Sequence, residues 1–278
     1  MPNLIKYAVE IAKKLGSEVI VVISKEEVTE KFDNVKIFHV PRSYATMLES
    51  VFWSLENGKS AIDKTLVEKA VILFQNKEYI STFLYFKGLE LNGNAVGVFN
   101  LELLRSILIV ELEKSRIQKI LSECAERVKP EVLRAVLTIA LNIAQKGREG
   151  KKIGTAFVIG DVDEVLKRSS PLILNPYKGH SEKDRDITNP DTWESVMEFA
   201  QLDGVFIIRE DGIIEAAGRY LEASGKDLKI KKGLGGRHLA CASITRETEA
   251  IAVVVSESGD IKVYKDGEEI LEINSSIL

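Results

Sequence analysis

The sequence predicts two α/β domains: a Rossmann-like three-layer domain at the N-terminus, followed by an α+β domain built on a mixed sheet. Three observations support this prediction. The chain has 278 residues, a length that fits two domains at about 150 residues each. Apolar runs alternate with amphipathic helical segments in the first part of the chain, which is typical of parallel sheets. In the last part, short apolar runs follow one another across tight turns, which is typical of antiparallel sheets.

The N-terminal domain is expected to begin with a helix. Apolar residues recur at helical spacing over residues 4–15, and Gly16 follows in the usual C-terminal position. The continuous apolar run 19–23 predicts a strand that is buried on both faces. The same kinds of pattern predict three further elements, which are strands at 35–40 and 81–86 and a helix at 61–74.

The domain boundary is predicted to lie inside a long helix over residues 101–127. Pro130 suits the first turn of the next helix, which Gly147 would end. The small α/β domain then covers residues 1–110, and the second domain covers residues 111–278.

The second domain is expected to contain a strand at 155–159, a polar loop at 175–189 and a helix that Asn189 caps. Asp211-Gly212 is a strong signal for a hairpin turn. The strands expected in the rest of this domain are 205–208, 213–217, 250–255, 261–265 and 269–273, and a helix is expected at 239–247, between the second and the third of them.

Composition excludes several classes of protein. Hydrophobic residues make up 45% of the chain and charged residues 29%, so the chain is globular and not disordered. The 38 basic and 42 acidic residues give a net charge of −4. A nucleic acid polymer is therefore not an expected partner, because no basic surface is available to replace its counterions.

The cysteine and histidine content indicates a reducing compartment. Two cysteines, Cys124 and Cys241, cannot form a disulfide framework, and three histidines do not make a zinc cluster. No apolar run approaches the ~20 residues of a membrane span, and the N-terminal residues lack a signal-peptide core. We therefore expect a soluble cytoplasmic protein that does not contact a membrane.

Two familiar phosphate-binding motifs are incomplete. Gly58-Lys59-Ser60 ends like a P-loop, but Trp53 stands where that motif requires its first glycine. Gly233-Leu234-Gly235 begins like a dinucleotide fingerprint, but His238 stands in place of the last glycine. Neither segment predicts a nucleotide fold of those kinds.

A cationic, glycine-rich segment at 229–238 immediately precedes the predicted helix at 239–247. Free backbone N–H groups and the helix dipole favour an anion there. Arg237 could bind phosphate oxygens with two hydrogen bonds, and His238 could donate a hydrogen bond or carry a proton. The alternative is an ordinary loop with an exposed arginine and a capping histidine.

Three further signals are weak when taken singly. Asp203 could bind a metal ion or activate a hydroxyl, or simply belong to a helix-ending turn. Tyr220 could stack on a base or pack in the core. Ser256-Glu257 could hold phosphate and metal, or only form a hairpin turn.

Together, these segments resemble the diadenylate cyclase domain over about residues 150–273, and the longer context is similar to the archaeal branch. The resemblance is carried, in order, by Asp203-Gly204-Val205, Ala216-Ala217-Gly218-Arg219-Tyr220-Leu221, Gly235-Gly236-Arg237-His238 and Val255-Ser256-Glu257. Asn175-Pro176 through His180 and Gly233-Leu234-Gly235 carry the archaeal likeness.

The resemblance implies that two ATP molecules are joined into cyclic di-AMP with release of two pyrophosphates. It implies at least a homodimer with apposed sites, and Mg²⁺ or Mn²⁺ held by Asp203 and Glu257. The implied catalytic residues are Asp203, Arg237 and His238. The implied ATP-binding residues are Gly204, Val205, Tyr220, Leu221, Gly235, Gly236, Arg237, His238 and Ser256.

The sequence departs from the family pattern at three positions. Gly236 replaces a threonine that is common before the Arg-His motif, so only the backbone can contact phosphate there. Val205 replaces an alanine, and Leu239 replaces a second arginine, whose charge Lys231, Lys232 or Arg246 could supply. These departures leave a second hypothesis open, a non-catalytic adenine-nucleotide sensor with a degenerate site. A third hypothesis is an assembly protein that shares only the fold. The first domain resembles the C-terminal domain of pyruvate kinase, which implies a regulatory or assembly role.

Overall fold

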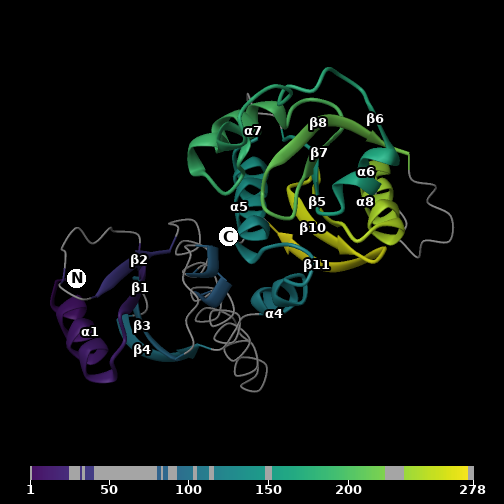
Figure 1. Cartoon of the computed structure of the whole chain (residues 1–278). Helices are drawn as coiled ribbons and strands as arrows, with labels where there is room; N and C mark the ends of the chain where they lie inside the picture. Colours follow the sequence, from purple (N-terminus) through teal and green to yellow (C-terminus); the bar gives the residue numbers. More distant parts are fainter. Residues whose placement is uncertain are drawn as a thin grey trace, which may run out of the picture. The chain divides into compact units, whose positions relative to one another are not determined.

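The computed structural model describes residues 2–24, 32, 35–40, 80–82, 84–86, 93–102, 105–112, 116–147, 152–222 and 235–274. The chain divides into two compact units, Met1–Gln118 and Lys119–Ile277. Each unit has its own sheet (Figure 1). Within the part of the chain that is described, no helix combines the length and the apolar character needed to cross a membrane.

The N-terminal unit contains a four-stranded sheet with the order β2-β1-β3-β4. β1 (Val19–Ser24) pairs in parallel with β2 (Lys36–His39) and with β3 (Gly93–Asn100). α1 (Pro2–Leu15) packs its apolar stripe on one face of this sheet. The predicted helix at 4–15 and the predicted strands at 19–23 and 35–40 are thus confirmed.

Two predictions for this unit are wrong. Residues 80–82 and 84–86 are helical, not a strand, and Ile80 and Leu84 pack one helical turn apart on the second face of the sheet. The predicted long helix is replaced by β4 (Arg105–Leu112) and the short α4 (Arg116–Glu123).

The sheet is therefore mixed, not wholly parallel as the Rossmann-like prediction required, because β4 runs antiparallel to β3. β3 itself was not predicted. Gly93, Asn94 and Gly97 give it weak β propensity, and its pairing with β1 and β4 determines its conformation. The predicted helix at 61–74 lies outside the described residues.

The C-terminal unit contains a seven-stranded sheet with the order β11-β10-β9-β5-β7-β8-β6. β5 and β7 are parallel to each other, and the other neighbouring pairs are antiparallel. The strands are β5 (Thr155–Ile159), β6 (Ser169–Pro171), β7 (Val205–Ile208), β8 (Ile214–Leu221), β9 (Ile251–Val255), β10 (Asp260–Lys265) and β11 (Glu268–Asn274). They confirm the strands and the hairpin predicted for this half of the chain.

Helices cover both faces of this sheet (Figure 1). α8 (Gly236–Glu247) and α6 (Val162–Lys167) bury apolar residues on one face. α5 (Pro130–Lys146) covers the other, and it begins at Pro130 and ends before Gly147 as predicted. Asn189 caps a short 3-10 turn (Pro190–Thr192) that leads into α7 (Trp193–Phe199).

A β-bulge interrupts the pairing of β10 with β11. Lys262 pairs with Glu272 and Val263 with Leu271, but Tyr264 pairs with Glu269. One extra residue, Ile270, is thus inserted in β11.

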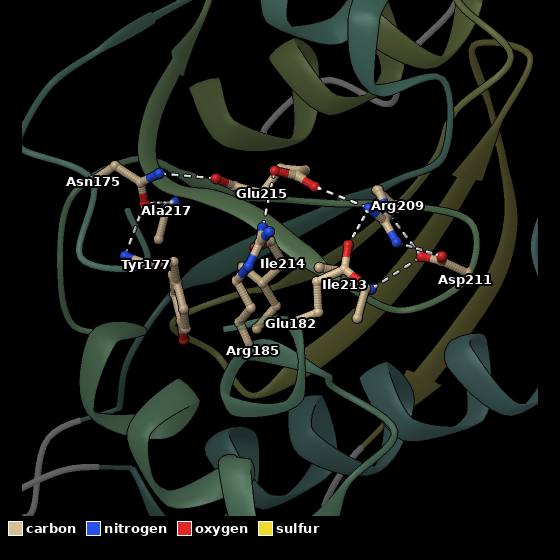
Figure 2. Close-up of polar contacts among 10 residues, drawn as sticks. All are labelled: Asn175, Tyr177, Glu182, Arg185, Arg209, Asp211, Ile213, Ile214, Glu215 and Ala217. Carbon is tan, nitrogen blue, oxygen red and sulfur yellow. Dashed lines mark hydrogen bonds and ion pairs between the residues drawn. The ribbon is translucent and has the colours of Figure 1, made fainter. Parts of the chain in front are cut away.

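The loop that leads from β6 to η1 (Glu182–Arg185) is fastened to β8 by a polar network (Figure 2). The Asn175 side chain accepts hydrogen bonds from the backbone N–H groups of Tyr177 and Ala217, at 3.1 and 3.3 Å, and donates to the Glu215 carbonyl at 2.8 Å. Arg185 donates to the Ile214 carbonyl and to the Glu215 carboxylate, both at 2.9 Å. The network holds the loop against the strand whose carboxyl end forms part of the site.

Candidate functional site

A pocket of about 590 Å³ lies at one end of the C-terminal unit's sheet. Its lining comes from the amino end of β7, the carboxyl ends of β8 and β9, and the first turn of α8. All the residues that the sequence analysis assigned to the site line this pocket: Asp203, Gly204, Val205, Tyr220, Leu221, Gly235, Gly236, Arg237, His238, Ser256 and Glu257. The fold thus gathers four segments that are far apart in the sequence.

The Asp203-Gly204 turn lies directly against the backbone of β8. Gly204 has a φ of +105°, and a Cβ added to it would lie 2.6 Å from the Arg219 nitrogen and 2.8 Å from the Arg219 oxygen. Only glycine fits this conformation and this close approach. Asp203 is exposed at the pocket, and no described residue forms a hydrogen bond or ion pair with its carboxylate. Its charge is therefore available to a ligand.

Gly154 is a site residue that the sequence analysis missed. A Cβ added there would lie 2.5 Å from Nη1 of Arg237 and 3.3 Å from Cγ of Glu257. The missing side chain thus makes room for the guanidinium at the pocket wall. The signal available in the sequence was a glycine immediately before the buried strand at 155–159.

Two arginines line the pocket, and they differ in whether the guanidinium has hydrogen-bond partners among the described residues. The Arg219 guanidinium is occupied, because it donates to the Leu166 carbonyl at 3.2 Å and to the Ser169 hydroxyl at 3.2 Å. Arg237 forms no ion pair or hydrogen bond with any described residue. Arg237 is therefore the arginine that can bind an anion.

His238 is buried at the base of the pocket, with 6% of its surface exposed. Its Nδ1 lies 3.0 Å from the hydroxyl oxygen of Tyr264, and the two rings meet edge to face. Burial lowers the pKa of His238, and the positive charge of Lys262 acts in the same direction. Tyr264 was not identified from the sequence, because it is one tyrosine within an apolar strand pattern.

Exposed apolar side chains form another part of the lining. Tyr220 is 57% exposed and Leu172 is 50% exposed. The backbone N–H of Leu172 donates to the Gly218 carbonyl at 2.8 Å, which joins its segment to β8. Leu172 was not identified from the sequence. The arrangement suits a flat, apolar group such as a base.

Ser256 organises the turn that carries Glu257. Its hydroxyl accepts a hydrogen bond from the Asp260 N–H at 3.0 Å and donates to the Asp260 carbonyl at 3.1 Å. Glu257 is exposed and lines the pocket together with Asp203. No group of three or more His, Cys, Asp or Glu side chains that could hold a metal ion is found among the described residues. Two carboxylates in one pocket are a donor set that suits a divalent cation which takes its other ligands from water or from a bound anion.

Two of the departures from the family pattern, Val205 and Leu239, lie in different environments. Val205 is 5% exposed and packs in the apolar core beneath α8. Leu239 is 42% exposed and does not line the pocket. Arg246 is in the last turn of α8, far from the pocket end of the helix, so it does not replace the missing arginine there. Lys231 and Lys232 lie outside the described residues.

Comparisons with known proteins match both parts of the chain. Residues 142–269 match the family model described as "DisA bacterial checkpoint controller nucleotide-binding". Residues 3–113 match the model described as "Probable sensor domain DacZ_A". For this first domain the sequence predicted a likeness to the C-terminal domain of pyruvate kinase, and the match found is to a sensor-domain model instead.

Two curated relatives are named diadenylate cyclase. The protein of Methanocaldococcus jannaschii is 44% identical over 153 residues, which cover 55% of this chain and 48% of the relative. The protein of Haloferax volcanii is 42% identical over 150 residues, which cover 53% of this chain and 54% of the relative. This chain thus spans about half the length of the curated relatives it matches. A solved structure of DacA from Staphylococcus aureus aligns with 53% of this chain and 89% of its own, with 26% identity and a TM-score of 0.38.

Proposed function

We propose that the C-terminal unit is a diadenylate cyclase that joins two ATP molecules into cyclic di-AMP and releases two pyrophosphates. The observation that carries the proposal is the pocket itself, which gathers the carboxylates of Asp203 and Glu257 with Arg237, His238 and the first turn of α8. The two relatives named diadenylate cyclase match this chain at 44% identity over 153 residues and at 42% identity over 150 residues. A reaction that consumes ATP also fits the cytoplasmic location expected from the sequence.

The phosphates of ATP would bind at the first turn of α8. Gly235 precedes the helix and Gly236 begins it, and a Cβ added to either would meet nothing within 4 Å. No described residue accepts a hydrogen bond from their backbone N–H groups, which would therefore be available to phosphate oxygens at the positive end of the helix dipole. The free guanidinium of Arg237 would add a charge-assisted contact.

The adenine would lie against Tyr220, with Leu172 and Leu221 completing an apolar wall. Asp203 would receive the proton of the ribose 3′-hydroxyl or hold the metal ion, and Glu257 would also hold the ion. Mg²⁺ or Mn²⁺, when bound, would supply positive charge to the phosphates. The chain's own residues contribute alignment of the nucleotide and electrostatic stabilisation.

The reaction requires a homodimer at least. Each 3′-hydroxyl attacks the α-phosphate of the other nucleotide, so two pockets, each with one ATP, have to face one another. A two-fold axis satisfies this requirement because the reaction is itself two-fold symmetric. We assign the first 110 residues a regulatory or assembly role, which the match to a sensor-domain model supports.

The proposal is tested by incubating the full chain with ATP and Mg²⁺ or Mn²⁺ and detecting the product by mass spectrometry. Cyclic di-AMP and pyrophosphate are expected, with a specific activity that rises with protein concentration until the dimer is fully formed. A constant specific activity down to concentrations at which the protein is monomeric would contradict the apposed-site arrangement.

The second candidate is an adenine-nucleotide sensor without turnover. The observation that favours it is Leu239, which leaves the family's second arginine without a counterpart among the described residues that line the pocket. Measurable ATP binding with no cyclic di-AMP at high protein concentration would establish this candidate and exclude the cyclase.

Replacing Gly154 by alanine is expected to weaken ATP binding about tenfold, because the new methyl group displaces the Arg237 guanidinium from the phosphates. Adenosine, which has no phosphate, should bind with unchanged affinity. Isothermal titration calorimetry with both ligands measures the difference. The control is Gly97→Ala in β3, where the nearest atom to the new methyl is 3.6 Å away. Equal losses for ATP and adenosine would show that the effect is not exerted through Arg237.

Replacing Tyr220 by alanine is expected to weaken ATP binding by about 1–3 kcal/mol, the range found when a ring that stacks on a base is removed. Equilibrium binding of ATP measures the change. Tyr7→Ala is the matched control, because Tyr7 is 59% exposed and lies on α1, outside the pocket. An unchanged ATP affinity in the Tyr220 variant would assign the adenine to another part of the lining.

A further inference from the structure

A buried hydroxyl lies behind the pocket and contacts a ring nitrogen of His238. The Tyr264 oxygen is 3.0 Å from Nδ1 of His238, and Tyr264 is only 1% exposed. No other described residue forms a hydrogen bond with this hydroxyl. Since His238 lines the pocket and its Nδ1 is engaged by Tyr264, Nε2 is the ring nitrogen that remains for a ligand.

The lack of a second partner determines the direction of this hydrogen bond. If Nδ1–H donated to the phenol oxygen, the proton of the Tyr264 hydroxyl would be buried without an acceptor, which is strongly disfavoured. If the hydroxyl donates to Nδ1 instead, every buried proton of the pair is satisfied. Burial also raises the pKa of Tyr264, so the hydroxyl keeps the proton that it donates. The imidazole proton then resides on Nε2.

After burial, the charge of Lys262 is the next largest influence that lowers the pKa of His238. Lys262 lies two residues before Tyr264 on the same face of β10. Its ammonium is 2.8 Å from the Glu269 carboxylate and 3.0 Å from that of Glu272. Burial lowers the pKa of Lys262, but the hydrogen bonds that its ammonium donates to these two carboxylates outweigh burial, so Lys262 stays charged.

The charged groups that act on the imidazole are the cations Lys262 and Arg237 and the carboxylates of Glu269 and Asp260. Burial is the largest influence and lowers the pKa of His238, and Lys262 is the next. A positive charge on the imidazole ring, in addition to the charge of Lys262 nearby, is therefore disfavoured at neutral pH.

We propose that Tyr264 is a positioning residue that holds His238 as the neutral Nε2–H tautomer, so that the imidazole donates a hydrogen bond to a phosphate oxygen. This role rests on the proposed nucleotide function of the pocket. Nδ1 is the only basic nitrogen of this tautomer, and Tyr264 occupies it. His238 therefore does not accept the proton of the ribose hydroxyl. Of the two roles left open by the sequence, hydrogen-bond donor or proton carrier, the geometry selects the donor.

Nitrogen-15 NMR of the histidine rings tests the tautomer directly. The full chain contains three histidines, and His238→Gln identifies the signals of His238. At pH 7 without ligand, the wild-type spectrum should show His238 with its proton on Nε2. A proton on Nδ1, or an imidazolium ring, would overturn the proposal. This readout needs no activity and no variant of Tyr264.

Tyr264→Phe should remove the hydrogen bond that fixes the tautomer, so that His238 becomes a mixture of its two neutral tautomers. The same variant should bind ATP about fivefold more weakly, with unchanged binding of adenosine. The matched control is Tyr177→Phe, because the Tyr177 hydroxyl is also buried but has no hydrogen-bond partner among the described residues. The control should leave the His238 signals and the ATP affinity unchanged. An unaltered Nε2–H signal in Tyr264→Phe would overturn the positioning role. A wild-type protein that shows this signal but forms no cyclic di-AMP would contradict the proposed function alone.

Discussion

The Asp203→Asn variant is expected to form cyclic di-AMP at least about 100-fold more slowly than the wild type, with little change in ATP affinity or thermal stability. Asparagine keeps the size of the side chain but cannot accept the proton of the ribose hydroxyl, a contribution that is typically worth about 10²–10⁴ in rate. It also removes one of the two carboxylates available for a divalent ion. Folding should be preserved, because Asp203 is exposed and makes no polar contact with any described residue.

Initial rates under saturating ATP, together with the melting temperature, measure these effects. Asp163→Asn serves as the control, since Asp163 is an exposed carboxylate in the first turn of α6, away from the pocket. Wild-type turnover in the Asp203 variant would remove this residue from the mechanism. A large fall in melting temperature would instead point to a structural role.

The Gly204→Ala variant is expected to lose about 3 kcal/mol of unfolding free energy, the combined effect of left-handed backbone strain and overpacking. The new methyl group would lie 2.6 Å from a backbone nitrogen of β8, and neither chain segment can relax as a flexible side chain would. Displacement of this turn should also move Asp203 and abolish turnover. Urea unfolding followed by circular dichroism measures the loss of stability.

Gly179→Ala separates strain from overpacking. Gly179 also has a positive φ, +89°, but a Cβ added to it would meet nothing within 4 Å. This variant should therefore lose only the conformational contribution, about 1 kcal/mol. Similar losses in the two variants would show that the close approach of the Asp203-Gly204 turn to β8 does not matter for stability.

Local pattern was sufficient for much of the fold. A single strong local signal was enough for three features that the structure confirms. These are the strand at 19–23, the helix bounded by Pro130 and Gly147, and the hairpin at Asp211-Gly212. Residues 105–112 combine helix-forming and β-branched types, so their local preference is ambiguous. Pairing with β3 determines that they form a strand.

The same contrast applies to the pocket. The sequence identifies three residues as candidate site residues because they lie beside a turn or a helix start. These residues are Asp203, Arg237 and His238. No local sequence signal identifies Gly154 or Tyr264, because a glycine before a strand and a tyrosine within a strand are both common. Their importance comes from tertiary contacts, with Arg237 in one case and with His238 in the other.

The β-bulge in β11 affects the charge beside the pocket of the candidate site. In a regular strand, Glu269 and Glu272 would face opposite sides of the sheet, because they are three residues apart. The extra residue shifts the alternation, so both carboxylates reach the Lys262 ammonium. Deleting one residue from β11 would leave Lys262 with a single counterion and a stronger positive field at His238. The length of an outer strand thus tunes the electrostatics of the site without contributing any atom to its lining.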